Sequence, residues 1–170
     1  NKKIFKMIDF HNHILPDVDD GSKSYEMSIE MIETASKQGI TDIINTVHFQ
    51  HPKMKNKNTD YDYIVSIKNN LNDKLASMGI DVNIHLGAEV FFDYNLVDLI
   101  SDRLVTFSNK SYMLVEFNIN YFPKDFQIVL YDLVKNNVTP IIAHPERYRQ
   151  VQLDVNILKD LIYSGSLVQI

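Results

Sequence analysis

Six short runs rich in isoleucine and valine alternate along the chain with longer stretches that carry apolar residues at helical spacing. The runs cover residues 7–10, 42–47, 82–86, 112–117, 140–143 and 167–170. They show little polar alternation, which is typical of strands buried on both faces of a parallel sheet. The chain is therefore predicted to adopt an α/β fold with a parallel sheet. Because a full (β/α) barrel takes roughly 250 residues, its 170 residues fit either an open doubly wound sheet or most of a barrel.

The helical stretches have recognisable ends. A helix is expected to start after Ser24, a suitable N-cap, and to stop at Gly39. The next one carries its apolar stripe to Met78, with Gly79 as the residue that follows its C-cap. Further helices are expected over residues 126–134, over 157–162 behind an Asp154 cap, and more weakly over 93–100.

Composition excludes several classes of protein. The chain is 45% hydrophobic and 23% charged, which is ordinary for one globular domain, so residues 1–170 are predicted to be a single domain. Its net charge is −5 and its 14 lysines are scattered, so no nucleic-acid partner is expected. No apolar run reaches the roughly 18 residues that a bilayer requires, so we expect no membrane insertion and a cytoplasmic protein. The final apolar run, Ser-Leu-Val-Gln-Ile, has no turn after it, which predicts that the chain is the N-terminal fragment of a longer barrel.

Histidines and glutamates follow or close five consecutive predicted strands. Each alone is more often a structural or solvated residue than a ligand. Five in register are hard to explain as independent accidents, because the carboxyl ends of parallel strands meet at one edge of the sheet, where sites are built. The sequence therefore predicts a metal site made from His11, His13, His48, Glu89, Glu116 and His144.

These side chains offer only nitrogen and oxygen ligands, which suit Mn and also Zn or Fe. Alternation along an extended segment points the rings of His11 and His13 to the same side, so that one ion can be held by both. A carboxylate such as Glu89 can bridge two ions in a multinuclear hydrolytic site. Such a site activates water at neutral pH.

The roles of several other residues remain open. The stretch Asp17-Val-Asp19-Asp20-Gly21 has its glycine one position too early for an EF-hand loop, although one of its aspartates could reach the metals. His85 has no motif partner, and His51 is as compatible with the surface as with the site. The chain has three arginines, and two follow His144. Arg147 is the better candidate for binding a substrate phosphate, whereas Arg149 fits a rim or surface position.

Three stretches carry a family resemblance. They are Asp-Phe-His-Asn-His-Ile-Leu-Pro-Asp-Val-Asp-Asp-Gly, Gly-Ala-Glu, and Ile-Ile-Ala-His-Pro-Glu-Arg-Tyr. The chain resembles the PHP (polymerase and histidinol phosphatase) superfamily and, within it, the bacterial protein-tyrosine phosphatases of the CpsB/CapC type in capsule and exopolysaccharide synthesis. The likeness runs from about Met7 to the end of the chain, in the right order.

The resemblance implies a PHP-type distorted, TIM-like barrel with two or three divalent ions, commonly Mn. It implies that His11, His13 and Glu89 hold one ion, and that Glu89 bridges to a second, held also by Glu116 and His144. Asp20 and His48 would hold the third, and Arg147 would bind the substrate phosphate. The chain departs from the family in two places. The family's late Asp-x-His motif is missing from these 170 residues. In the stretch Thr46-Val-His48-Phe-Gln-His51, the family usually has a proline before the first histidine and a second histidine directly after it.

By that resemblance the protein is predicted to be a metal-dependent protein-tyrosine phosphatase, a hydrolase whose partner is a phosphotyrosine protein, a bacterial tyrosine autokinase. Metal-bound hydroxide would attack phosphorus. The chain has no cysteine, so the thiolate mechanism of the familiar tyrosine phosphatases is excluded for it. Two alternatives remain: another PHP phosphomonoesterase with a small substrate like histidinol phosphate, and a catalytically inert truncated or regulatory module.

Overall fold

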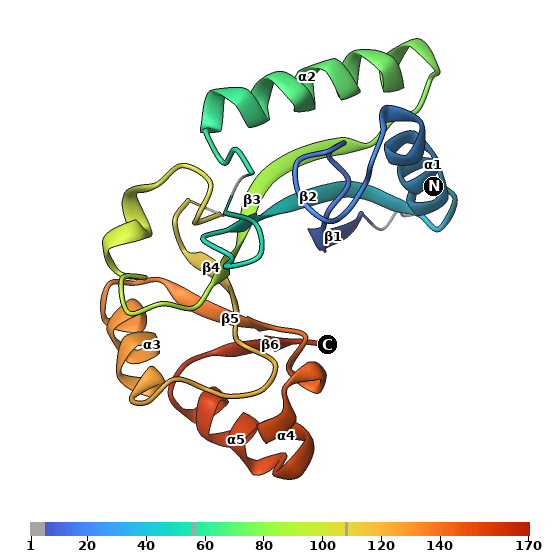
Figure 1. Cartoon of the computed structure of the whole chain (residues 1–170). Coiled ribbons are helices and arrows are strands. Elements are labelled where there is room, and N and C mark those ends of the chain that lie inside the picture. Colours follow the sequence, from blue (N-terminus) through green and yellow to red (C-terminus); the bar gives the residue numbers. More distant parts are fainter. Residues whose placement is uncertain (1–5, 56, 108) are drawn as a thin grey trace. The chain divides into compact units, whose positions relative to one another are not determined.

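The computed structural model describes residues 6–55, 57–107 and 109–170 (Figure 1). Its strands are β1 (Met7–Asn12), β2 (Ile40–Phe49), β3 (Asn83–Phe91), β4 (Tyr112–Glu116), β5 (Thr139–Ala143) and β6 (Leu167–Gln169). Its helices are α1 (Tyr25–Lys37), α2 (Tyr61–Ser77), α3 (Phe126–Lys135), α4 (Arg149–Leu153) and α5 (Asn156–Tyr163), with short 3-10 helices η1 (Asp98–Ser101) and η2 (Pro145–Arg147).

The described strands form one six-stranded sheet in the order β1-β2-β3-β4-β5-β6. The pairs β1–β2, β3–β4, β4–β5 and β5–β6 are parallel. The predicted α/β fold with a parallel sheet is therefore confirmed. Two compact units divide the chain, with β3 passing from one to the other. The N-terminal unit contains residues up to 48 and 54–87, and the C-terminal unit contains 49–53 and 88–170.

In the N-terminal unit, helices α1 and α2 pack against each other. Ile32 of α1 and Ile64 and Leu71 of α2 are fully buried. The side chain of Ser24 accepts a hydrogen bond from the backbone N–H of Met27, so the predicted N-cap is confirmed. Gly79 has a φ of +70° directly after α2, the left-handed conformation that favours glycine at this position.

In the C-terminal unit, helix α3 packs on β5, and α5 packs on β6 and α4 (Figure 1). An aromatic cluster fills the space beside the end of β4. The ring of Phe117 stacks on that of Phe92 with centroids 4.7 Å apart, and it meets the rings of Phe122, Phe126 and Tyr148 at steeper angles.

Two expectations about the elements were wrong in detail, and one helix was not predicted. Residues 93–100 do not form an α-helix; only the 3-10 turn Asp98–Ser101 is present, because the Asp93 carboxylate accepts from the N–H of Tyr94 in a local turn. Helix α5 begins one residue later than an Asp154 cap would place it, although the Asp154 carboxylate does accept the N–H of Asn156. Helix α4 was not predicted, since five residues are too few to show a helical period.

Candidate metal centre

Three predicted ligands come together in the N-terminal unit. His13 follows β1, Asp20 lies in the next loop, and His48 lies near the end of β2. The Nε2 of His48 is 3.2 Å from the Oδ1 of Asp20, and the rings of His13 and His48 have centroids 4.8 Å apart. One ligand atom from each of the three lies within 4.8 Å of the others. This spacing suits side chains that share one ion after small rotations.

Asp19 orients this group. Its side chain is only 3% exposed, and its Oδ2 lies 2.8 Å from the Nδ1 of His13. The backbone N–H groups of Gly21 and His48 also donate to the Asp19 carboxylate, at 3.0 and 3.2 Å. Burial raises the pKa of Asp19, but the hydrogen bond and charge of His13 and the two N–H groups outweigh burial and hold this pKa below its ordinary value.

An ionised Asp19 accepts and cannot donate, so the Nδ1 of His13 must carry the proton. In the neutral ring, the lone pair of His13 is therefore on Nε2. This is the arrangement in which a carboxylate fixes the tautomer of a metal-binding histidine. Sequence reasoning did not single out Asp19, although it noted that one of the loop aspartates could reach the metals.

The loop after β1 is held tightly against His13. A Cβ at position 21 would overlap the backbone oxygen of His13, closer than any side chain can approach. The backbone N–H of Ser22 donates to that same oxygen at 3.0 Å, and the backbone N–H of Asp17 donates to the backbone oxygen of Ser22 at 2.9 Å. Glycine is required at position 21 because of this close approach, which brings Asp19 and Asp20 beside His13.

His11 lies within β1 rather than after it. The pairing of β1 with β2 shifts register between Asp9 and Asn12, and such irregularities re-aim side chains. The ring of His11 lies 5.5 Å from that of His13, at an interplanar angle of 61°. Asn12 and Leu15 are tied to β2 through the side chains of Thr46 and Asn45.

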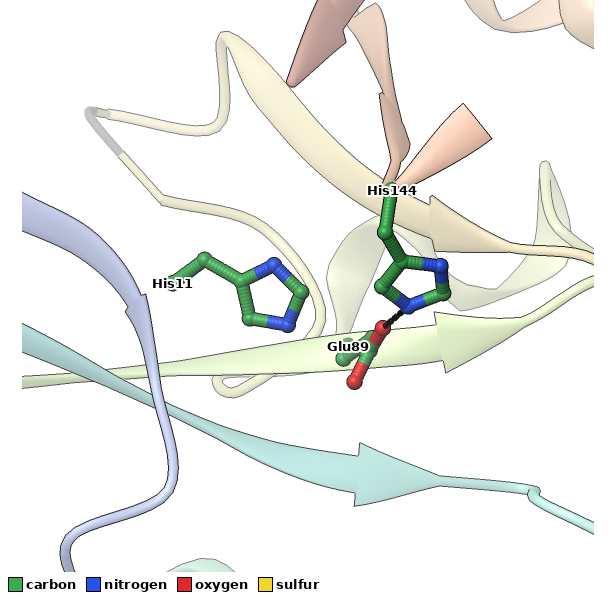
Figure 2. Close-up of side chains that lie close together, drawn as sticks. All are labelled: His11, Glu89 and His144. Atoms are coloured by element: carbon green, nitrogen blue, oxygen red, sulfur yellow. Dashed lines mark hydrogen bonds and ion pairs between the residues drawn. The ribbon is translucent and has the colours of Figure 1, made fainter. Parts of the chain in front are cut away.

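A second group lies in the C-terminal unit, at neighbouring strands. Glu89 is on β3, Glu116 is the last residue of β4, and His144 follows β5 directly. The Nε2 of His144 is 2.7 Å from the Oε1 of Glu89 (Figure 2) and 3.9 Å from the Oε1 of Glu116. Glu89 is 1% exposed. Figure 2 also labels His11, the residue of β1 described above.

The backbone around His144 is strained and is stabilised by Tyr148. His144 has a φ of +32°, in the left-handed region that few non-glycine residues adopt, and Pro145 then starts η2. The buried hydroxyl of Tyr148 donates to the oxygen of Ala143 at 2.7 Å and accepts the N–H of Phe117 at 3.0 Å. Burial raises the pKa of Tyr148 far above its usual value, so the hydroxyl stays protonated. Tyr148 thus links the ends of β4 and β5, from which Glu116 and His144 project.

The remaining residues are placed as follows. Arg147 is 67% exposed, with its Nε 4.0 Å from the Oε1 of Glu146. Arg149 is exposed, and its N–H donates to the oxygen of Ile119. His85 pairs with Asp42 at 3.0 Å. The Nε2 of His51, which the sequence left open, lies 3.6 Å from the Oε2 of Glu116.

The strand boundaries correct one detail of the prediction. His11, His48 and Glu89 were expected just past the ends of their strands, but β1, β2 and β3 continue through them. Glu116 closes its strand as predicted. The apolar runs ended too early as markers: the run 42–47 stops before His48 and Phe49, which still belong to β2.

The donor set fits divalent metal ions. Both groups contain imidazole nitrogens and carboxylate oxygens, the ligands of Zn, Mn and Fe sites. The neutral His13 ring held by Asp19 presents a lone pair at Nε2, and the carboxylates of Asp20, Glu89 and Glu116 supply negative charge.

Residues 7–170 match the family described as capsular polysaccharide synthesis, CpsB/CapC. The chain belongs to the CpsB/CapC family. It is 34% identical over 165 residues to a putative tyrosine-protein phosphatase CapC of Staphylococcus aureus, and 34% identical over 166 residues to the tyrosine-protein phosphatase YwqE of Bacillus subtilis. These matches cover 96% of the chain and 64% of each relative, so the chain spans about two thirds of the length of these curated relatives.

A solved structure has a closely similar fold. It comes from work on crystal structures of YwqE from Bacillus subtilis and CpsB from Streptococcus pneumoniae, described as unique metal-dependent tyrosine phosphatases. The TM-score is 0.89 at 33% identity, covering 96% of this chain and 66% of that one. The likeness to the CpsB/CapC type inferred from the sequence motifs is thereby confirmed.

Proposed function

We propose that this CpsB/CapC protein is a metal-dependent phosphotyrosine-protein phosphatase. The observation that carries the proposal is that each unit contains a histidine–carboxylate group, and that Asp19 fixes the tautomer of His13 in one of them. Family membership supports the same activity, because relatives at 28–34% identity are named tyrosine-protein phosphatases. The family also supports a PHP-type distorted barrel, with residues 1–170 belonging to a single PHP domain.

The proposed ligands fall into two sets. In the N-terminal unit they are His11, His13, Asp20 and His48, and in the C-terminal unit they are Glu89, Glu116 and His144. Divalent ions bound there would polarise a phosphoryl oxygen and lower the pKa of a water molecule. We propose Mn as the working metal, since the family resemblance implies Mn and the three carboxylates of the set are ligands that suit it.

The chain's own residues supply orientation and charge. Asp19 holds the ring of His13, and Tyr148 holds the strand ends that carry Glu116 and His144. The exposed guanidinium of Arg147 is the proposed phosphate-binding group, because its planar fork matches phosphate oxygens. No cysteine thiolate is available in these 170 residues to act as a nucleophile.

A tyrosine autokinase in the cytoplasm is the proposed partner. Capsular polysaccharide synthesis, in the family description, is the process that this partner would serve. Within the part of the chain that the structure describes, no helix combines the length and apolar character needed to cross a bilayer.

A comparison of substrates tests this function. The protein is incubated with Mn²⁺ and either a phosphotyrosyl peptide or histidinol phosphate, and phosphate release is measured before and after a chelator is added. We expect a higher kcat/KM for the peptide and loss of the rate with chelator. A preference for histidinol phosphate would favour the small-molecule alternative, and absence of both rates would favour an inert module. Peptide hydrolysis that survives chelation would rule the proposal out.

A further inference from the structure

His51 lies in the C-terminal unit and is held there by its neighbours. Its side chain is 11% exposed, and its ring meets that of Phe91 edge-on, with centroids 5.0 Å apart. The preceding residue, Gln50, has a φ of +48° and donates from its amide to the oxygen of Phe91 at 2.8 Å. The amides of Gln50 and Asn95 also exchange two hydrogen bonds at 3.2 Å. These contacts fix the direction of the His51 ring.

The Nδ1 of the His51 ring is a hydrogen-bond acceptor. The backbone N–H of Lys53 donates to the Nδ1 of His51 at 3.1 Å. A backbone N–H can only donate, so Nδ1 must be the unprotonated nitrogen. The proton of the neutral ring is then on Nε2, which faces the Oε2 of Glu116 at 3.6 Å.

His13 shows the opposite arrangement. Its Nδ1 faces the Asp19 carboxylate and must donate, which leaves the lone pair on Nε2. A histidine that binds metal almost always donates from its other nitrogen in this way. His51 accepts at its other nitrogen, so its Nε2 carries a hydrogen and offers no lone pair to an ion.

We propose that His51 is a positioning residue that donates from Nε2 to Glu116 and is not itself a metal ligand. This inference rests on the proposed function. The two oxygens of Glu116 face different partners: Oε1 faces His144 at 3.9 Å, and Oε2 faces His51. The separation of 3.6 Å exceeds a hydrogen bond, and the proposal requires the Glu116 carboxylate to turn toward Nε2 when the ions are bound. His51 would thus hold Glu116 with Oε1 directed at the ion beside His144.

Two substitutions separate a donor from a ligand. H51Q keeps an N–H group near the position of Nε2, whereas H51F keeps a ring against Phe91 but has no donor. Calorimetric titration with Mn²⁺ gives the number of ions and their affinity for each variant. We expect unchanged numbers of ions at saturation, a fall in affinity of about 10–100-fold for H51F, and recovery of most of it in H51Q. The absorption spectrum of the Co²⁺-loaded H51Q protein should match that of the unsubstituted protein.

Loss of one ion at saturation in both variants, or a changed Co²⁺ spectrum in H51Q, would show that His51 is a ligand. An unchanged affinity in H51F would show that it is neither. If H51F does not fold, imidazole ¹⁵N NMR of the unsubstituted protein decides: we expect a proton on Nε2 alone for His51, and a proton on Nδ1 of His51 overturns the inference. Failure of the unsubstituted protein to bind Mn²⁺ would instead count against the proposed function.

Discussion

Asp19 and Asp20 are adjacent and chemically identical, yet their surroundings give them different roles. Asp19 is 3% exposed and accepts three hydrogen bonds, whereas Asp20 is 60% exposed and faces His48. We predict that D19N lowers the affinity for Mn²⁺ by about 10–100-fold, because a buried amide would present N–H to groups that themselves donate. Calorimetry measures this change. D17N is the matched control, since Asp17 is exposed and pairs only with Lys57 among its side-chain contacts in the described structure. Equal affinity in D19N and the control would refute the orienting role.

Gly21 offers a second prediction at the same scale. A methyl group at this position would overlap the backbone of His13, which cannot move without disturbing the hydrogen bond from Ser22. We expect G21A to reduce the free energy of unfolding by at least about 1–3 kcal/mol, the usual cost of overpacking. Urea denaturation of the metal-free protein measures it. If G21A unfolds at the same urea concentration as the unsubstituted protein, the loop has more room than the structure shows.

Much of the site could be predicted from the sequence because parallel strands bring their carboxyl ends together. That rule alone places Glu89, Glu116 and His144 near one another. It could not separate Asp19 from Asp20, because their burial depends on the loop folding back onto His13. Nor could it orient His51, since nothing in the sequence predicts the left-handed backbone of Gln50.

At the level of elements, one side chain joins two strand ends. The Tyr148 hydroxyl donates a hydrogen bond to the backbone oxygen of Ala143 and accepts one from the backbone N–H of Phe117. Ala143 and Phe117 are both buried. In Y148F both backbone groups lose this partner, and each buried unsatisfied group costs about 1–3 kcal/mol. We therefore predict a loss of about 2–4 kcal/mol in urea denaturation, together with weaker Mn²⁺ binding. Y163F is the control, because Tyr163 is 87% exposed on α5. Similar midpoints for the two variants would contradict the prediction.

For the whole molecule, metal binding and folding should be coupled. The ligands of each group come from segments distant in sequence, so the unfolded chain cannot present them together. Saturation of one site at 100 times its Kd adds about 2.7 kcal/mol to the free energy of unfolding. We expect the Tm to rise with Mn²⁺ concentration and to fall again with chelator, as measured by scanning calorimetry. A Tm independent of Mn²⁺ would mean that no ion binds preferentially to the folded protein.

The central claim is that the histidine–carboxylate groups bind the ions on which phosphatase activity depends. Glu89 tests it most directly, because it is 1% exposed, bonds His144 at 2.7 Å, and can be changed to an isosteric amide. Metal content and phosphotyrosyl-peptide hydrolysis are measured together for E89Q and the unsubstituted protein. The account predicts that E89Q binds fewer Mn²⁺ ions and loses at least about 100-fold in kcat/KM, a cost of about 2.7 kcal/mol in transition-state stabilisation. An E89Q protein with full metal content and full activity would contradict it.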